Sequence, residues 1–324
     1  MDEVNVGLVA GIDKPISRLV QGTVMLREDD LPTSFALLDA AYEAGITAFD
    51  TARHYSRGNE ATFGRWVRER GLRDDVVIIG KGAHHSPERK RVTPADIAAD
   101  LDESLRQFGL DAIDLYLLHR DDPEAPVGPI VEALNGHLRA GKIRAFGGSN
   151  WSHERIAEAN AYAAAGGLVP FVASSPHFSL VDQIEAPWPD CISIAGPGGA
   201  AARAWYEREQ MPVFAWSSLA GGFLSGGFSR DSSGPLPEAV AEQARRVYGT
   251  DDNYRRLERA GVLAKELGLT VPQIGLAYAL SQPLNLFTIA AGESKEEVTL
   301  NAAAAAVSLP QETREWLDLS RETR

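Results

Sequence analysis

The sequence has a single cysteine, Cys191, among its 324 residues. One cysteine excludes an intramolecular disulfide framework and any zinc site built on several cysteines. Long apolar runs are also absent, since no stretch approaches the roughly 20 residues that a transmembrane helix needs. The chain begins with Met1, Asp2 and Glu3, so it has acidic side chains where a signal peptide has basic ones. We therefore predict a cytoplasmic protein with no membrane partner.

Basic residues are fewer than acidic ones. The sequence has 32 Lys and Arg and 45 Asp and Glu, which gives a formal net charge of −13. Proteins that bind nucleic acid or an anionic membrane surface present basic surface, so we expect neither partner. The charge also disfavours strongly anionic substrates unless a local basic patch exists. The length suits one large barrel domain, and no change in composition marks a second. We predict a single domain over residues 1–324.

What the sequence does contain is an alternation of short β-branched apolar runs with longer segments of helical period. Such alternation predicts parallel strands joined by right-handed crossovers, and eight units predict a closed (β/α)8 TIM barrel with long loops at its C-terminal face. A doubly wound sheet is disfavoured because residues 22–24, Gly-Thr-Val, do not continue as G-x-G-x-x-G. The Gly-, Ser- and Pro-rich segment 221–252 is expected to be a mobile surface excursion. The predicted strands are 18–22, 48–50, 76–81, 114–119, 144–147, 171–174, 213–216 and 286–290.

Chemically active side chains follow several of these strands. The second strand ends at Asp50, with Tyr55 in the next loop, and the third and fourth end at Lys81 and His119. In such barrels the active site lies at the C-terminal strand ends. Each residue alone has an ordinary structural interpretation, but Asp50 and Lys81 follow apolar residues, where an unpaired charge is costly. We therefore expect an Asp50–Lys81 pair, with all four side chains converging at the barrel mouth.

The stretch 48–55, Ala-Phe-Asp-Thr-Ala-Arg-His-Tyr, followed by Asn59-Glu60, resembles the signature of the aldo-keto reductase family. Lys81 and His119 match that family's other two catalytic positions. Residues 141–144, Gly-Lys-Ile-Arg, and 148–150, Gly-Ser-Asn, match its fifth-strand motif. The resemblance covers nearly the whole chain, from residue 18 to about residue 309.

The resemblance implies hydride transfer between a nicotinamide and a carbonyl carbon, with Tyr55 as the general acid, or as the base in the oxidation direction. Because a free phenol has a pKa near 10, we expect the Lys81 ammonium, anchored by Asp50, to lower the pKa of Tyr55. His119 would hydrogen-bond the carbonyl oxygen. We expect no metal site, since His84 and His85 are adjacent and point oppositely on an extended segment.

The resemblance also implies a set of cofactor-binding positions. Trp216 would stack on the nicotinamide ring, and residues 217–222 would wrap the pyrophosphate with backbone N–H groups. The implied contacts are Gly22, Thr23, Ser149, Asn150, Ser175, Trp216, Ser217, Leu219, Gly221, Ser294, Lys295 and Asn301.

Three departures from the family pattern matter. Ser175 stands where Gln is usual, so its carboxamide contact is either lost or mediated by water. Glu297 stands where many relatives carry an Arg that grips the 2′-phosphate of NADP, while Ser294 or Lys295 can still contact that phosphate. We predict NADP(H) as the cofactor, with NAD(H) as the alternative. The third departure is an insertion over 185–202, which forms either a substrate wall or an ordinary surface loop.

The substrate is less well defined by the sequence. Aromatic faces beside polar donors suit sugars or aromatic aldehydes, and we slightly prefer polyhydroxylated substrates. Arg120 either binds a substrate carboxylate or hydroxyl, or pairs with Asp121 or Asp122. The candidate pocket residues are Met25, His54, Arg120, Trp151 and Trp188.

Three functional hypotheses therefore stand. The first is a nicotinamide-dependent oxidoreductase acting on an aldehyde, ketone or sugar carbonyl, including an NAD-linked sugar or alcohol dehydrogenase. The second is a cofactor-binding regulatory subunit similar to the channel-associated β subunits, which intact Asp50, Tyr55, Lys81 and His119 do not exclude. The third is an aldolase or isomerase that forms a Schiff base on Lys81, which the cofactor-like motifs disfavour. The oligomeric state is left open.

Overall fold

The computed structural model describes residues 6–55 and 58–324. At its centre is a closed barrel of eight parallel strands, in which neighbours follow the chain order and the last strand pairs with the first. The predicted TIM barrel is thus confirmed, and the strand ends differ from the prediction by one or two residues. The strands are β3 (Leu19–Gly22), β4 (Ala48–Asp50), β5 (Val77–Gly82), β6 (Ile113–Leu118), β7 (Ile143–Ser149), β8 (Ala173–Ser175), β9 (Val213–Ala215) and β10 (Leu286–Ala290).

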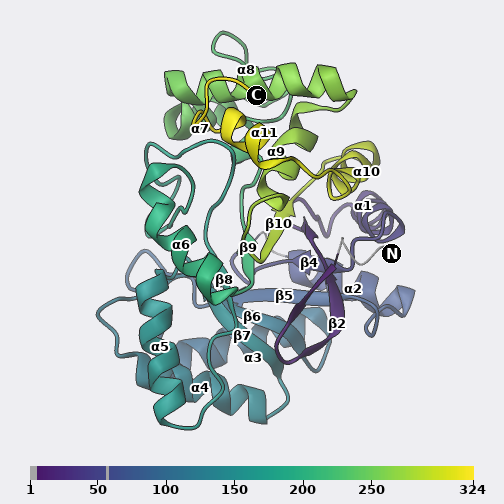
Figure 1. Cartoon of the computed structure of the whole chain (residues 1–324). Helices are drawn as coiled ribbons and strands as arrows, with labels where there is room; N and C mark the ends of the chain where they lie inside the picture. Colours follow the sequence, from purple (N-terminus) through teal and green to yellow (C-terminus); the bar gives the residue numbers. More distant parts are fainter. Residues whose placement is uncertain (1–5, 56–57) are drawn as a thin grey trace.

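Helices surround the barrel on its outside (Figure 1). Their ends follow local sequence signals: α3 begins after the Thr93 N-cap with Pro94 in its first turn, and ends at Gly109, which takes a left-handed φ of 62°. Within the described residues the helices are α1 (Leu31–Glu43), α2 (Asn59–Arg70), α3 (Pro94–Phe108), α4 (Val127–Arg139), α5 (His153–Ala165), α6 (Ala200–Glu209), α7 (Glu238–Tyr248), α8 (Asp251–Leu267), α9 (Val271–Leu280), α10 (Lys295–Ala304) and α11 (Gln311–Leu317).

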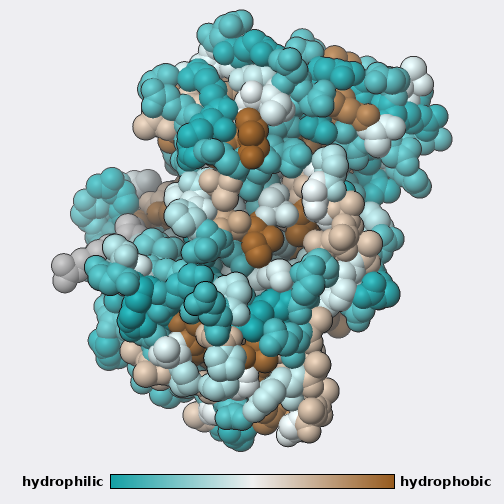
Figure 2. All heavy atoms as spheres, turned by 90° about the vertical axis from the view of Figure 1, so that its left-hand side faces the viewer, coloured by the Kyte–Doolittle hydropathy of each residue, from teal (hydrophilic) through white to brown (hydrophobic). Residues whose placement is uncertain are grey.

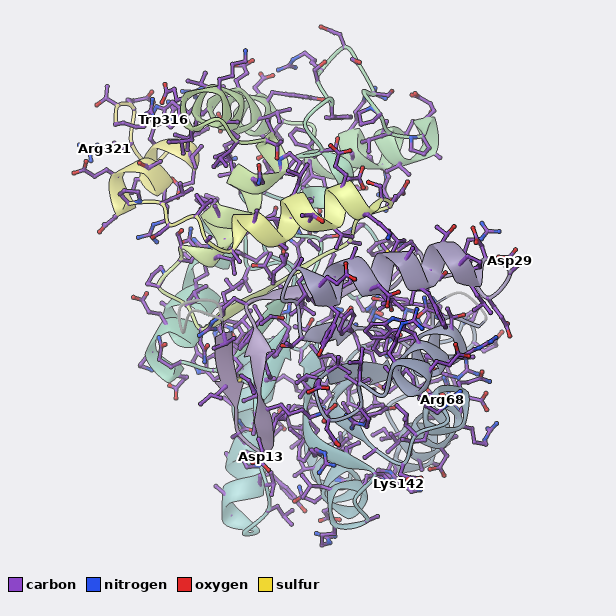
Figure 3. All side chains as sticks on the ribbon, turned by 90° about the vertical axis from the view of Figure 1, so that its right-hand side faces the viewer. Asp13, Asp29, Arg68, Lys142, Trp316 and Arg321 are labelled. Carbon is purple, nitrogen blue, oxygen red and sulfur yellow. The ribbon has the colours of Figure 1, made fainter. Side chains whose placement is uncertain are left out.

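A hairpin that the sequence analysis did not predict closes one end of the barrel. Strands β1 (Val6–Val9) and β2 (Ile12–Ser17) pair in antiparallel fashion, and Val9, Ile12 and Ile16 pack into the apolar cluster inside the barrel. Lys14 on β2 forms an ion pair of 3.0 Å with Asp114 at the start of β6. Figure 3 labels Asp13 near the tip of this hairpin. The N-terminal strand ends are therefore covered, which leaves the opposite mouth for ligands.

The segment 221–252 is more ordered than predicted. It contains the short 3₁₀ turn η3 (Ala220–Gly222) and helix α7. Ala241, Ala244 and Val247 recur at helical spacing, and they are buried in the core between α7, α8 and α9. The sequence analysis did not predict this helix, because its apolar stripe lies within a segment whose overall composition resembles a loop.

The outer surface agrees with the acidic, charge-rich composition. On the face that Figure 2 shows, hydrophilic residues cover most of the area, and hydrophobic ones gather in small groups. Within the described residues, no helix combines the length and the apolar character needed to cross a bilayer.

Candidate active site

A buried ion pair joins the ends of β4 and β5. These strands are neighbours in the barrel, so Asp50 and Lys81 lie side by side, each only 2% exposed. The Nζ atom of Lys81 is 2.5 Å from Oδ1 of Asp50, and it also donates a hydrogen bond to the carbonyl oxygen of Thr51 at 3.1 Å. The pairing predicted from the sequence is present, and it offsets part of the free energy needed to bury two charges.

Tyr55 and His119 complete this cluster. The hydroxyl of Tyr55 donates a hydrogen bond to Oδ2 of Asp50 at 3.3 Å, and the centroid of its ring is 5.4 Å from Nζ of Lys81. His119 follows β6, and its ring centroid lies 6.2 Å from that of Tyr55 in an edge-to-face arrangement. The structure therefore brings the four side chains at the strand ends into one small volume.

The protonation of Tyr55 differs from the expectation. Burial, together with the negative charge of Asp50 and the hydrogen bond to it, raises the pKa of Tyr55 well above its ordinary value. The predicted net lowering of this pKa by Lys81 was wrong, because burial and the carboxylate of Asp50, the charged group in contact with the hydroxyl, outweigh it. Tyr55 is therefore held as a neutral phenol, ready to donate a proton.

His119 is neutral at physiological pH. Burial, followed by the positive charges of Lys81 and Arg120, holds the pKa of His119 well below its ordinary value. Within the described part of the chain, its buried Nδ1 atom has no hydrogen-bond partner. A neutral imidazole with a free ring nitrogen can hydrogen-bond a ligand oxygen without transferring charge.

Asn59 is a positioning residue whose role the sequence analysis missed. It is buried at the start of α2, and its Nδ2 donates a hydrogen bond to the carbonyl oxygen of Thr23 at 2.5 Å. Its Oδ1 accepts hydrogen bonds from the hydroxyls of Thr23 and Thr51, at 3.1 and 3.0 Å. Thr23 also binds the carbonyl oxygen of Asp50. One amide thus ties the ends of β3 and β4 together through Thr23 and Thr51, a role that becomes visible only once β3, β4 and α2 are assembled.

Two further histidines lie beside His119. The rings of His54 and His84 stack with centroids 3.6 Å apart and planes within 4° of parallel, and His84 meets His119 edge-on at 5.0 Å. Nδ1 of His84 lies 2.8 Å from the carbonyl oxygen of His85 and must carry the proton, since a carbonyl only accepts. Burial lowers the pKa of His84 to about 4, so it too is neutral.

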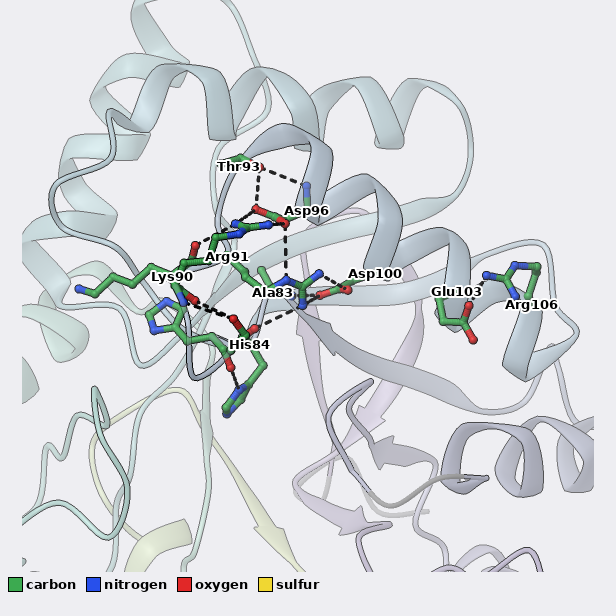
Figure 4. Close-up of polar contacts among 12 residues, drawn as sticks. Ala83, His84, Lys90, Arg91, Thr93, Asp96, Asp100, Glu103 and Arg106 are labelled. Carbon is green, nitrogen blue, oxygen red and sulfur yellow. Dashed lines mark hydrogen bonds and ion pairs between the residues drawn. The ribbon is translucent and has the colours of Figure 1, made fainter.

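The loop that carries His84 is fixed to α3 (Figure 4). Arg91 donates two hydrogen bonds to Asp100, at 2.8 and 3.0 Å, and Asp100 also accepts from the backbone N–H of Ala83 at 2.8 Å. His84 is therefore held rigidly beside the site. Within the described residues, no group of three or more His, Cys, Asp or Glu side chains is arranged to hold a metal ion.

Several of the predicted cofactor residues meet at the ends of β7, β8 and β9. Ser149 donates a hydrogen bond to the carbonyl oxygen of Ser175 at 3.0 Å, and Nδ2 of Asn150 donates to the Ser149 hydroxyl at 3.2 Å. The Ser175 hydroxyl and Nε1 of Trp216 are buried and unpartnered within the described residues. Since unpartnered buried polar atoms are rare, their presence fits a polar ligand such as the carboxamide of a nicotinamide.

The loop after β9, where the sequence predicted a pyrophosphate contact, has several residues with positive φ. Ser217 and Ala220 have positive φ values of 51° and 54°, and Gly221 and Gly222 continue with 57° and 97°. A Cβ atom at Gly221 would meet only Tyr248, at 3.9 Å, so there is open space beside this backbone. The N–H groups of Ala220 and Gly222 donate to the carbonyl oxygens of Ser217 and Leu219 at 2.7 and 3.1 Å, so the loop closes these turns with its own hydrogen bonds.

The candidate adenosine end lies at the start of α10. Ser294 caps this helix by accepting a hydrogen bond from the N–H of Glu297 at 3.2 Å, and Glu297 itself accepts from the N–H of Glu293 at 2.7 Å. Lys295 is exposed at the same helix start, and Asn301 is buried further along α10. Glu297 therefore places a carboxylate at the position where a 2′-phosphate contact was expected.

The insertion at 185–202 lies against the barrel mouth. The N–H of Ile192 donates to Oδ1 of Asn150 at 3.1 Å, and the ring centroids of Trp188 and Trp216 are 6.1 Å apart. A cavity of about 440 Å³ opens between the insertion and α5, and Asn150 and Cys191 contribute to its wall. The insertion therefore packs against the predicted cofactor residues Asn150 and Trp216, and the substrate wall stays a prediction.

The candidate substrate residues divide into two groups. Trp151 is 1% exposed and packs on Phe171 in the core, so the expectation that it lines the pocket was wrong. Its indole N–H instead supports the backbone by donating to the carbonyl oxygen of Arg120. Trp188 is 51% exposed, His54 is exposed, and Met25 is half-buried near β3.

Comparison with known proteins agrees with this geometry. The model of the "Aldo/keto reductase family" matches residues 18–320. An "Uncharacterized oxidoreductase YrpG" of Bacillus subtilis is 27% identical over 94% of this chain and 91% of its own length. A "Probable voltage-gated potassium channel subunit beta" of rice is 28% identical, over 89% of this chain and 86% of its own. The "Aldo-keto reductase yakc", of Schizosaccharomyces pombe, whose name includes NADP(+), is 29% identical over 86% of this chain and 79% of its own.

The family match covers residues 18–320, which include all eight barrel strands. The chain therefore belongs to the aldo/keto reductase family, whose members include oxidoreductases.

Proposed function

We propose that this protein is a nicotinamide-dependent oxidoreductase that interconverts an aldehyde, ketone or sugar carbonyl with the corresponding alcohol. The observation that carries the proposal is the carboxylate of Asp50, which contacts the Lys81 ammonium through one oxygen and the Tyr55 hydroxyl through the other. Such an arrangement keeps a protonated phenol beside a compensating positive charge.

Each side chain of the site would have a separate role in the reaction. Tyr55 gives its proton to the carbonyl oxygen, and Lys81 stabilises the phenolate that is left behind. His119 orients the carbonyl by donating a hydrogen bond from its neutral ring, and Asn59 holds Thr23 and Thr51 together beside Asp50. A nicotinamide held by Ser149, Asn150 and Trp216 would supply or accept the hydride.

NADP(H) is the proposed cofactor, and the yeast relative whose name includes NADP(+) supports this choice. NAD(H) is the alternative, and the carboxylate of Glu297 at the start of α10 favours it because it would repel a 2′-phosphate.

The test is a screen of reduced and oxidised forms of both nicotinamides against a panel of aldehydes, ketones, sugars and alcohols, followed by the absorbance of the reduced cofactor. We expect turnover of at least one carbonyl compound, and its loss in Tyr55→Phe. Cofactor binding without turnover of any compound would instead favour a regulatory subunit, the alternative to which the rice relative's name points. If the protein bound neither nicotinamide, both the oxidoreductase proposal and the regulatory-subunit alternative would be contradicted.

A further inference from the structure

Arg120 is a buried cation for which the described residues provide no anionic partner. It is 6% exposed, and its Nη1 donates a hydrogen bond to the carbonyl oxygen of His119 at 2.9 Å. Buried charges in proteins are normally paired, because an unpaired one is costly to remove from water. An unpaired guanidinium beside an active-site histidine therefore indicates a place for an anion supplied from outside the chain.

The carboxylates nearest to Arg120 along the chain and across the rim have other partners. The alternative in which Arg120 pairs with Asp121 or Asp122 was therefore wrong. The observed ion pairs are Asp121 with Arg155 at 3.2 Å and Asp122 with Lys90 at 3.6 Å. Asp190 contacts His85 at 3.3 Å, and because burial lowers the pKa of His85 this contact is a hydrogen bond to a neutral ring.

The backbone that carries Arg120 is held from both neighbouring strands. The N–H of His119 donates to the carbonyl oxygen of Gly82 on β5 at 2.7 Å. On the other side, Asn150 and Trp151, which follow β7, donate to the carbonyl oxygens of His119 and Arg120 at 3.3 and 3.2 Å. The start of the Arg120 side chain is thus fixed before any ligand arrives, which reduces the entropy lost on binding.

The charge of Arg120 acts on the proposed reaction site. After burial, it is among the positive charges that depress the pKa values of His119 and His54. It also acts to lower the pKa of Tyr55, against the larger effects of burial and of Asp50. Its guanidinium hydrogen-bonds the carbonyl oxygen of His119 at 2.9 Å, so it lies beside the residue proposed to orient the carbonyl group of a substrate.

The position of Arg120 in the barrel separates it from the proposed cofactor phosphates. Arg120 follows β6, whereas the loops proposed for the pyrophosphate and adenosine follow β9 and β10. In the closed barrel β7 and β8 lie between β6 and β9, and β6 is diametrically opposite β10. The anion that fits Arg120 therefore belongs to the substrate.

The number of cations without a partner favours a ligand of low charge. Lys81 is paired with Asp50, and His54, His84 and His119 have depressed pKa values. Among the described residues Arg120 thus supplies a single guanidinium without an ion-pair partner, which suits a carboxylate better than a phosphate dianion. A guanidinium also matches a carboxylate geometrically through two parallel hydrogen bonds.

We propose that Arg120 binds a carboxylate of the substrate, so that the protein acts on oxo acids, small molecules that carry an aldehyde or ketone together with a carboxylate. The inference rests on the function proposed above and narrows its substrate class. Arg120 is then a specificity-determining residue.

The first experiment compares 4-carboxybenzaldehyde with 4-carbamoylbenzaldehyde, two aldehydes of similar size that differ in charge, and repeats the comparison with the 3-substituted pair. We expect the wild-type protein to prefer the carboxylate in kcat/KM by about 10- to 100-fold in at least one pair, mostly through KM. Arg120→Gln and Arg120→Met should bring this ratio close to one, and Arg120→Lys should retain part of it.

Lys90→Gln is the matched control, because Lys90 is an exposed cation on the same rim. It should leave the preference ratio unchanged. A wild-type protein that reduces both members of each pair equally well would overturn the inference, as would a ratio that survives in Arg120→Gln, or one that falls equally in Lys90→Gln.

The second experiment needs no turnover. Binding of benzoate and of benzamide is measured by calorimetry, with and without NADP⁺, on the wild-type protein and on folded Arg120 variants checked by circular dichroism. We expect benzoate to bind more tightly than benzamide, and this difference in affinity to vanish in Arg120→Gln.

The two experiments together distinguish the two proposals. If no aldehyde is reduced but the difference between benzoate and benzamide depends on Arg120, the proposed reductase function fails while the anion site stands. If aldehydes are reduced but benzoate shows no such dependence, the anion site fails alone.

Discussion

The hydroxyl of Tyr55 donates a hydrogen bond to Oδ2 of Asp50 at 3.3 Å, the carboxylate oxygen that Lys81 does not contact. Asp50 therefore stands between the proposed acid and its compensating cation. This arrangement keeps the phenol protonated through the neutral range, and it makes release of the proton depend on the positive charge of Lys81.

Replacing Tyr55 by Phe removes the proton donor and little else. We expect Tyr55→Phe to retain cofactor affinity, measured by fluorescence titration, and to lose about 10²- to 10⁴-fold in kcat. Tyr42→Phe is the control, since Tyr42 lies on α1 and contacts Trp66 rather than the site. Equal losses of affinity and rate in Tyr55→Phe would assign this residue a structural role.

The pH profile of carbonyl reduction should fall on its alkaline side and show no fall near the ordinary pKa of histidine. Burial lowers the pKa of Lys81 below its ordinary 10.5, and as the pH rises through that value the ammonium is lost and Asp50 is left uncompensated beside Tyr55. His119, with a depressed pKa, is neutral throughout and should add no loss of rate near its ordinary value of 6.5.

This profile is measured as kcat against pH, with Lys81→Arg as the comparison. The arginine variant should move the alkaline fall to higher pH, because a guanidinium keeps its proton. An acid-side fall of rate near the ordinary pKa of histidine would show that the neutral role assigned to His119 is wrong.

Charge reversal at Glu297 should change the cofactor preference. Its carboxylate caps the N–H of Glu293 at the start of α10, so Glu297→Arg replaces a repulsive charge with one that attracts a 2′-phosphate. We expect the ratio of kcat/KM for NADPH over that for NADH to rise about tenfold or more. Glu296→Arg, one residue earlier on the same exposed turn, tests whether net charge alone explains the change. No change with Glu297→Arg would mean that the 2′-phosphate position lies elsewhere.

The stability of the protein should depend on Glu60, which is buried on α2. Burial raises the pKa of Glu60 from 4.5 to about 7. The folded state therefore holds its proton more tightly than the unfolded state, and this contribution to stability is lost as the pH rises from about 4.5 through 7.

Glu60→Gln should remove that loss, so that the variant is more stable than the wild type at pH 8 by roughly 2 to 3 kcal/mol and gains little at pH 4. Denaturant unfolding at the two pH values measures the difference. Glu43→Gln, at an exposed position of α1, should leave the pH dependence unchanged. A gain of the same size at both pH values would mean that the effect does not arise from ionisation.

The sequence was sufficient for the barrel and for the set of residues at its mouth. Alternation of β-branched runs with helical periods depends on local chemistry, and it located every barrel strand. Parallel strands of a closed barrel end on the same rim, so Asp50, Lys81 and His119 had to meet there once the fold was known. The hairpin β1–β2 was missed because its six-residue second strand carries Lys14 and Pro15, which weaken the strand pattern.

Only the tertiary structure decided which partner each charged or polar group has. Asp121 pairs with Arg155 on α5 rather than with its neighbour Arg120, and Trp151 lies in the core rather than in the pocket. Likewise, Tyr55 contacts Asp50, which reverses the pKa shift expected from Lys81. The physical reason is that ionisation and specificity depend on burial and on distances of a few ångströms between side chains from different loops. Hydrophobic periodicity along the chain carries no information about those distances.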